Sequence, residues 1–424
     1  MTDINTSLFY IISISGLLYF LIINRRFDAF TLAYISAVFY FSPGFFGFVP
    51  TYSLPPTELI VPQTYLIMNL VLFFTLSSAF IYDSIFANSK IVKINLNHNE
   101  IQNLLFFNNI LLIMSISAFV LNTLTVDVSM LAGGAEKRDL LGASTLFYNF
   151  WVYPAILVCC ISFFIKKWNF FFIGTLLLLL DMYLYAIRAH FILTFIAITT
   201  FYFFNLGKIR LIRYVRYFII FFPIFLFLFA FKSFIRPLND GDYALFFERL
   251  FDADIYIYWL TRAEPFNQVA ILNKVIYTNF SSPIAQISQA FFSLVPYSGY
   301  LDIGIKPRFH EYFHHVLYPH TPPGAIANNP WAQMYSMYGI LMVIVSLFFY
   351  TASIFLINAK IFFSRSNLIK FSLFIVLPIL CFYAHRNDIY FTVLMSKRLF
   401  LPLLGAYILR LFYIQLMQGK LRFN

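Results

Sequence analysis

The chain has 424 residues, of which 61% are hydrophobic and only 11% are charged. A soluble globular domain is roughly half apolar and a quarter charged, so this composition excludes an ordinary soluble domain and predicts a membrane protein. The formal net charge is +11, but the basic residues form short clusters between apolar runs, which is typical of membrane topology and not of nucleic-acid binding.

A spanning helix needs roughly 20 predominantly apolar residues. The first apolar run, residues 7–23, has no basic residue before it and no small-residue cleavage site after it, so we interpret it as a retained helix and not as a signal peptide. The hydrophobic pattern predicts about 11 spanning helices (range 10–12). They cover residues 7–23, 28–49, 63–87, 104–124, 145–165, 169–187, 190–205, 217–235, 331–357, 368–385 and 399–417.

The connections between these segments predict the orientation. Linkers and tails that fall on one side are rich in Lys and Arg and contain only two clear acids, Asp28 and Glu100. The positive-inside rule makes this side cytoplasmic, which places the N-terminus outside and the C-terminus inside. The predicted fold is thus an all-α polytopic membrane protein. It has N-terminal helices over residues 1–235, one large external loop over 236–330 and C-terminal helices over 331–424.

The large loop is too polar to span a membrane and too aromatic for a disordered linker. Residues 243–262 and 282–294 show amphipathic patterns that predict helices on or near the membrane surface. The three cysteines, Cys159, Cys160 and Cys381, all fall in apolar segments, so no disulfide framework is expected in this loop. A loop of this length in a small membrane protein is usually functional.

Residues 310–320 of the loop read HEYFHHVLYPH and contain the H-E-x-x-H motif of zinc metalloproteases. In that interpretation His310, His314 and His320 bind zinc, and Glu311 activates water. The longer form of the motif needs glycine where this chain has Leu317. We therefore favour a polar helix without a metal, in which an imidazole acts as a general base near neutral pH.

Basic residues also occur at helix ends on the external side. They are Arg188, Lys232, Arg236, Arg386, Lys397 and Arg398, with Arg410 inside the last apolar segment. Any single one can place its charge among lipid headgroups. As a group they favour an anionic ligand, because arginine matches phosphate oxygens in a fork, and a lipid-linked pyrophosphate is the natural candidate. Asp181 lies seven residues before Arg188, where it can orient that arginine, line a polar cavity or act as a structural partner.

Three local features complete the pattern: AIRAH around Arg188, SLVPYSGYLDIGIKP in the large loop, and TPPGAIANNPWAQMYSMYGI before the next helix. With its many helices and one large loop, the chain resembles bacterial O-antigen polymerases of the Wzy type. In the third of these stretches, related O-antigen ligases often show His-Asn, then an aromatic residue, then Glu-x-Gly. Here Asn328, Trp331 and Met337 stand where that histidine, aromatic and glutamate are expected, so both polar positions depart from the ligase pattern.

The resemblance implies an architecture related to GT-C membrane glycosyltransferases, in the bacterial inner membrane, with an active site that faces the periplasm. It also implies an undecaprenyl-pyrophosphate-linked oligosaccharide as donor, a second lipid-linked repeat unit as acceptor, and no metal or other cofactor. A chain-length regulator protein is a further candidate partner. The growing chain moves onto the new unit, and undecaprenyl pyrophosphate is released.

The predicted site follows from this chemistry. Fixed guanidinium groups stabilise charge on the leaving pyrophosphate, a role that we assign first to Arg188 and Arg236 and then to Arg386 and Arg398. The candidate general bases are His314 and His310, with Glu311 as the alternative. Lys306 and Arg308 are expected to hold the acceptor's phosphates. The expected substrate-lining residues are Asp181, Tyr297, Tyr300 and Asn329, with Tyr312 and Trp331 as further aromatic candidates for sugar stacking.

Other functions compete with this one. A glycan-lipid flippase is expected to show internal repeats and a site at the bilayer midplane, and the sequence shows no repeat. A polyprenyl-monophosphate glycosyltransferase is expected to carry acids in its first external loop, where residues 50–62 hold only Glu58. The O-antigen ligase has closely similar chemistry, and Asn328 is the sequence argument against it.

Overall fold

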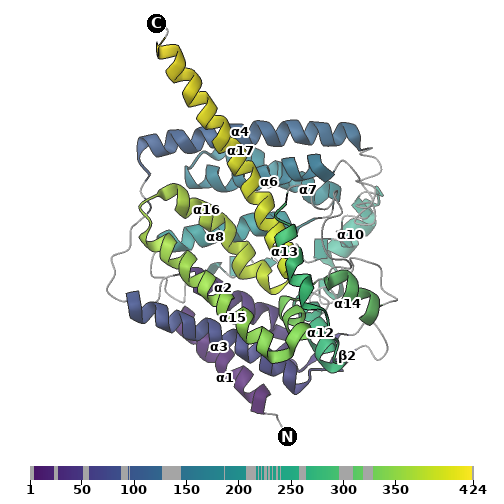
Figure 1. The fold of residues 1–424 in the computed structure, drawn as a ribbon. Helices are drawn as coiled ribbons and strands as arrows, with labels where there is room; N and C mark the ends of the chain where they lie inside the picture. Colours follow the sequence, from purple (N-terminus) through teal and green to yellow (C-terminus); the bar gives the residue numbers. More distant parts are fainter. Residues whose placement is uncertain are drawn as a thin grey trace.

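In the computed structural model of the chain, long helices pack into one bundle (Figure 1). The structure describes residues 4–22, 27–50, 57–86, 94, 96–126, 145–185, 187–206, 240–256, 264–295, 309–318 and 328–422, and scattered positions between 216 and 238. Within this part of the chain, nine helices are long and apolar enough to cross a membrane. They are α1 (Ile4–Leu21), α3 (Pro62–Phe86), α4 (His98–Thr125), α6 (Thr145–Phe164), α7 (Trp168–Tyr185), α8 (Ala189–Leu206), α15 (Pro330–Phe363), α16 (Asn367–Leu377) with its continuation to His385, and α17 (Ile389–Arg422).

Each of the nine helices coincides with a predicted apolar segment, so the prediction of a helical, multi-pass membrane protein is confirmed. The predicted span 28–49 differs in extent. Its α-helix, α2 (Ala29–Tyr40), has only 12 residues and leads into the 3₁₀ helix η1 (Ser42–Phe45). Pro43 explains this end, because proline disfavours helical geometry at the residue before it. Of the predicted span 217–235, the structure describes only scattered positions, and these are helical.

After η1, strand β1 (Phe48–Pro50) pairs antiparallel with β2 (Thr57–Leu59), with Val49 opposite Glu58. Among the described residues, the regular structure is helical except for this two-stranded sheet. It lies next to α12 (Glu264–Tyr277), whose Asn273 side chain accepts from Val61 N at 2.9 Å and donates to Leu59 O at 3.1 Å. The hairpin therefore fixes a helix that is distant in sequence.

The segment predicted as an external loop contains α10 (Tyr243–Phe251), α12, the 3₁₀ helix η3 (Ile284–Ile287), α13 (Ser288–Phe292) and α14 (Phe309–Leu317). Within the predicted helix 243–262, α10 ends at the cap residue Asp252, residues 253–256 are helical again, and residues 257–262 lie outside the described residues. Helix α12 was not predicted, and it does not lie on the surface. Val269, Leu272 and Val275 are fully buried, so α12 packs inside the protein as part of its core.

The connections of the bundle emerge at two sides. The end of α3 and the turn between α15 and α16 lie at the left of Figure 1, and α10, α12, α14 and β2 lie at the right. Helix α17 runs steeply across α4, and its last turns extend beyond the other helices. Arg410 on α17 contacts α4 there, with its guanidinium 2.6 Å from Asn103 Oδ1 and 5.5 Å from the centre of the Phe107 ring.

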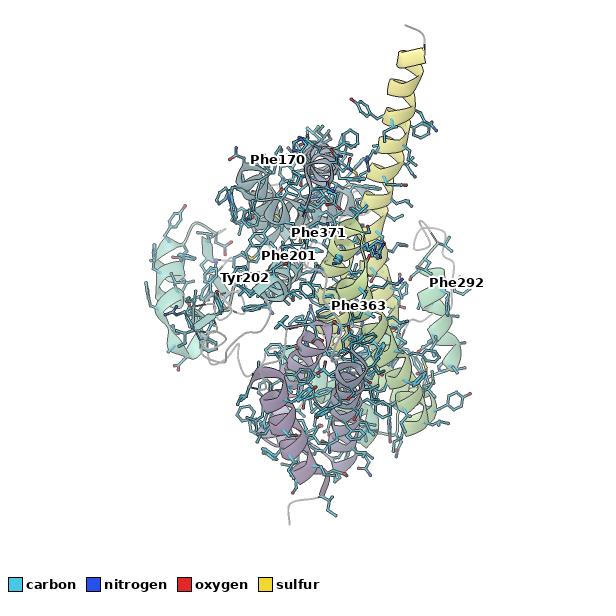
Figure 2. All side chains as sticks on the ribbon, turned by 90° about the vertical axis from the view of Figure 1, so that its left-hand side faces the viewer. Phe170, Phe201, Tyr202, Phe292, Phe363 and Phe371 are labelled. Atoms are coloured by element: carbon cyan, nitrogen blue, oxygen red, sulfur yellow. The ribbon has the colours of Figure 1, made fainter. Side chains whose placement is uncertain are left out.

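Aromatic side chains fill the interior between these helices (Figure 2). Phe371 on α16 stacks on Phe164 of α6, with ring centres 4.8 Å apart, and it lies 5.6 Å from Phe201 of α8. The π-helical turn η4 (Pro378–Phe382) and the 3₁₀ turn η5 (Tyr383–His385) then continue α16 toward the start of α8. This packing joins α6, α8 and α16 around one end of the bundle.

Asp28 and Glu100, the two acids of the linkers predicted to be cytoplasmic, take part in helix caps that join distant elements. Asp28 caps α2 by accepting from Thr31 N at 2.9 Å, and Asn358 Nδ2 of α15 donates to its other oxygen at 2.9 Å. Glu100 forms a capping box with Asn97 at the start of α4, and Asn367 of α16 donates to it at 3.0 Å. Charge in these linkers is therefore paired with hydrogen-bond donors, as burial near apolar helices requires.

Helix α15 is interrupted near its start. Tyr338 and Gly339 have non-helical backbone angles, and Gly339 has φ 62° and ψ −146°. That region of φ and ψ is essentially restricted to glycine. The buried first turns, which carry Trp331, are thus a separate short helix that precedes the long apolar one.

Candidate functional site

The candidate site is built around the short connection between α7 and α8. Helix α7 ends at Tyr185, and Arg188 directly precedes α8, where its carbonyl accepts from Ile192 N at 3.0 Å. The side chain of Arg188 is partly exposed. It therefore lies at the N-terminal end of an 18-residue helix, where backbone N–H groups and the helix dipole favour an anion.

Asp181 and His190 meet across this connection. Asp181 Oδ2 is 2.9 Å from His190 Nδ1, and Tyr148 of α6 donates its hydroxyl to Asp181 Oδ1 at 2.8 Å. The Asp181 side chain is fully buried, and that of His190 keeps 8% of its surface exposed. The structure thus gives Asp181 two hydrogen-bond partners, Tyr148 and His190, neither of which was predicted.

Tyr153 of α6 joins this pair to the last helix. Its ring centre lies 5.2 Å from that of His190, in an edge-to-face arrangement. The guanidinium carbon of Arg398 lies 5.9 Å from the centre of the same ring, within cation–π range. His190 and Arg398 therefore contact one aromatic side chain, although they are far apart in sequence.

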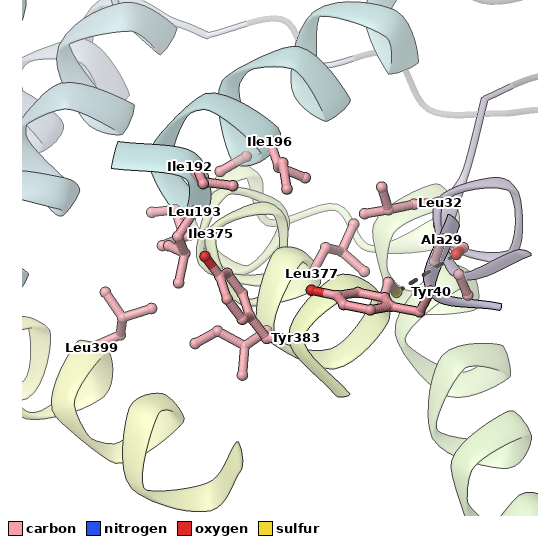
Figure 3. Close-up of a cluster of buried hydrophobic side chains, with 14 of the residues drawn as sticks. Ala29, Leu32, Tyr40, Ile192, Leu193, Ile196, Ile375, Leu377, Tyr383 and Leu399 are labelled. Carbon is pink, nitrogen blue, oxygen red and sulfur yellow. Dashed lines mark hydrogen bonds between the residues drawn. The ribbon is translucent and has the colours of Figure 1, made fainter. Parts of the chain in front are cut away.

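Tyr383 joins the site to η5. Its hydroxyl donates to the carbonyl of Ala189 at 3.0 Å, and Figure 3 shows its ring beside Ile192 and Ile375. The guanidinium carbon of Arg386 lies 5.6 Å from the centre of this ring. Three predicted arginines, Arg188, Arg386 and Arg398, thus gather at the start of α8, and together with Asp181 and His190 we call them the arginine site.

An apolar groove with a cavity volume of about 660 Å³ lies between α4, α6, α16 and α17, beneath the end of α13. Leu104, Phe107, Ile161, Phe400 and Tyr407 contribute to its walls. Its polar end contains Lys397, whose ammonium donates to the carbonyls of Ser293 and Val295. Because Lys397 directly precedes Arg398, the groove begins next to the arginine site.

The HEYFH motif forms α14, as the pattern predicts. Phe309 and Phe313 are buried, and Tyr312 packs on Phe280 after α12, with ring centres 5.2 Å apart. His314 is partly exposed and Glu311 is exposed. Within the described residues, no group of three His, Cys, Asp or Glu side chains forms a metal site. The side chain of His310, and His320 altogether, lie outside the described residues.

The side chain of Asn329 forms hydrogen bonds that connect α15 with α12. Its Oδ1 accepts from Trp331 N and Ala332 N and caps α15, and its Nδ2 donates to Gln268 O of α12 at 2.8 Å. Trp331 Nε1 in turn donates to His385 Nδ1 at 3.3 Å, and Tyr350 Oη lies 3.2 Å from His385 Nε2. We call Asn329, Trp331, Tyr350 and His385 the α15 anchor. The predicted residues Arg236, Tyr297, Tyr300, Lys306 and Arg308 lie outside the described residues.

In comparisons with family models, curated proteins and solved structures, nothing matches the chain. The geometry at the start of α8 therefore carries the functional argument.

Sequence reasoning missed His190 and three tyrosines of this geometry, Tyr148, Tyr153 and Tyr383. A signal for His190 was present, because a histidine beside an arginine and an aspartate in a neighbouring apolar segment mark a polar site at the membrane. Tyr153 gave no such signal, since tyrosine is frequent in this chain and at membrane interfaces.

Proposed function

We propose that the chain is a Wzy-type polymerase of lipid-linked oligosaccharides with a GT-C-related architecture. It transfers the growing glycan from undecaprenyl pyrophosphate to a new lipid-linked repeat unit at the periplasmic face of a bacterial inner membrane. The glycosidic bond to the pyrophosphate breaks, a bond to an acceptor hydroxyl forms, and undecaprenyl pyrophosphate leaves. A chain-length regulator protein is a proposed partner.

The observation that carries this proposal is the gathering of Arg188, Arg386 and Arg398 at the start of α8. They come from three separate parts of the sequence, and one of them precedes a helix N-terminus. Negative charge grows on the pyrophosphate as the bond breaks, and fixed guanidinium groups with helix N–H groups stabilise such charge. Three arginines that only anchored the protein to headgroups would have no reason to converge.

The apolar groove supports the same substrate class. A polyprenyl pyrophosphate needs an apolar channel for its chain and a cationic site for its head. The groove runs between α4 and α17, and Lys397, which lines it, directly precedes Arg398 in sequence. In this proposal the groove holds the polyprenyl tail of the donor, and the arginine site holds its pyrophosphate head.

The test is a lipopolysaccharide gel from the deletion strain complemented with wild type, Arg188→Ala or Arg398→Ala. Wild type is expected to restore a ladder of long chains. Both variants are expected to leave the lipid A core with a single repeat unit, because loss of one transition-state donor typically reduces the rate about 10²- to 10³-fold. Membrane immunoblots must show that each variant is made.

Arg410→Ala is the matched control. It removes an arginine from the same helix, but this arginine contacts Asn103 and Phe107 of α4 and not the arginine site. We expect a normal ladder. A deletion strain that shows core without any repeat unit would favour a ligase or a flippase, and normal ladders from both site variants would contradict the role of the arginines.

A further inference from the structure

Asp181 is the starting point, because a fully buried carboxylate between apolar helices is costly unless it has partners. It has two: the Tyr148 hydroxyl at one oxygen and His190 Nδ1 at the other. A structural carboxylate needs only donors. A carboxylate that fixes an imidazole through one nitrogen also leaves the second nitrogen for chemistry.

The hydrogen bonds favour one tautomer of a neutral imidazole. Tyr148 donates to Asp181 Oδ1, and Asp181 Oδ2 lies 2.9 Å from His190 Nδ1. A neutral imidazole that donates from Nδ1 to this carboxylate carries its lone pair on Nε2. Within the part of the chain that the structure describes, Nε2 has no hydrogen-bond partner, and the side chain retains 8% of its surface.

The position of His190 relates it to two of the arginines. It stands two residues after Arg188, and its ring and the guanidinium of Arg398 contact the same tyrosine, Tyr153. A pyrophosphate held by these arginines would leave the donor's anomeric carbon close to the imidazole. A positioned base must lie within hydrogen-bond reach of the hydroxyl it deprotonates, so the acceptor hydroxyl has to enter beside Nε2 and close to the anomeric carbon.

We propose that His190 is the general base of the transfer, and that Asp181 holds its imidazole in the reactive orientation. This inference rests on the proposed function. The acceptor hydroxyl gives its proton to Nε2 while its oxygen bonds to the anomeric carbon. The bond between that carbon and the pyrophosphate oxygen breaks, and its electron pair leaves with undecaprenyl pyrophosphate. Asp181 stabilises the imidazolium that forms and does not itself take the proton.

This assignment competes with the predicted base on α14. His314 is partly exposed on a short helix, α14, whose Tyr312 packs on Phe280. His190 is held by a buried carboxylate, and its ring packs on Tyr153, over which the guanidinium of Arg398 lies. One substitution at each position therefore separates the two histidines.

The experiment uses the full-length protein in lipid nanodiscs with a synthetic undecaprenyl-pyrophosphate-linked repeat unit. Initial rates give kcat and KM for elongation, and retention of the radiolabelled substrate gives binding. His190→Gln keeps an amide donor for Asp181 and removes the basic nitrogen. We expect kcat to fall about 10²- to 10⁴-fold with substrate binding unchanged. His314→Gln is the matched control and is expected to keep its kcat.

Asp181→Asn provides a second variant of nearly equal volume, in case His190→Gln does not fold. It removes the charge that stabilises the imidazolium, so kcat is expected to fall while KM stays near the wild-type value. Normal kcat in either folded variant overturns the assignment of His190. If wild type itself fails to elongate, the polymerase proposal is overturned, and this inference is overturned with it.

Discussion

The arginine site and the α15 anchor each contain a buried histidine, and the two histidines differ in one respect. His385 is fully buried, and both of its ring nitrogens have partners, Trp331 Nε1 at Nδ1 and Tyr350 Oη at Nε2. His190 is nearly as buried, but only Nδ1 has a partner within the described residues. Burial therefore does not distinguish the two histidines, whereas the number of engaged nitrogens does.

The residues around the two histidines also differ. Aromatic rings enclose His385, with Tyr40, Phe41, Trp331 and Tyr350 within 6.2 Å between ring centres. Near His190, two arginines pack on aromatic rings instead. Arg398 lies over Tyr153, whose ring packs on that of His190, and Arg386 lies over Tyr383, whose hydroxyl donates to Ala189 O. Because Arg386 directly follows His385 in sequence, the end of η5 connects the α15 anchor with the arginine site.

The largest expected effect is on the anchor. His385→Ala removes a fully buried ring and leaves the Trp331 and Tyr350 polar groups without their partner. A core cavity and two unsatisfied groups together cost about 4 kcal/mol in the free energy of unfolding. Thermal unfolding in detergent is expected to show a clearly lower Tm, whereas His190→Gln is expected to keep its Tm. Equal Tm values for wild type and His385→Ala would contradict the structural role of His385.

A smaller effect is expected at Asn329. Asn329→Ala removes the cap of α15 and the bond to Gln268 O, which together contribute about 2 kcal/mol. The measurement is again Tm, with Asn387→Ala as the control, since Asn387 donates only to the weak acceptor Met395 Sδ. The folded fraction is expected to elongate glycans normally. Lost turnover at unchanged Tm would return Asn329 to its predicted place beside the substrate.

The sequence was sufficient for the long apolar helices and insufficient for α12. Nine predicted segments formed helices, because a window of about 20 apolar residues can do little else in lipid. Helix α12 carries Gln268, Asn273 and Lys274, which made it look like a loop. Asn273 is satisfied by Leu59, Val61 and Thr64, more than 200 residues away, and such partners cannot be recognised locally.

Part of the arginine site was also predictable from the sequence. Arginines at helix ends stand out in an apolar sequence, and three of those predicted came together. The pairing of Asp181 with His190 did not follow from helical spacing, because α7 ends at Tyr185 and the two residues meet across a turn. Counting turns from Asp181 to Arg188 assumed a continuous helix that the chain does not form.

The smallest expected effect gives the sharpest comparison, because the same change can be made beside each histidine. Tyr148→Phe and Tyr350→Phe each remove one hydroxyl and keep the ring. Tyr148 donates to the Asp181 carboxylate, a charge-assisted bond that contributes about 1.5 kcal/mol, so its loss is expected to reduce kcat about tenfold. Tyr350→Phe is expected to lower Tm modestly and to leave kcat unchanged. Equal kcat values for the two variants, measured in the nanodisc assay, would mean that the Asp181 carboxylate needs no second donor to position His190.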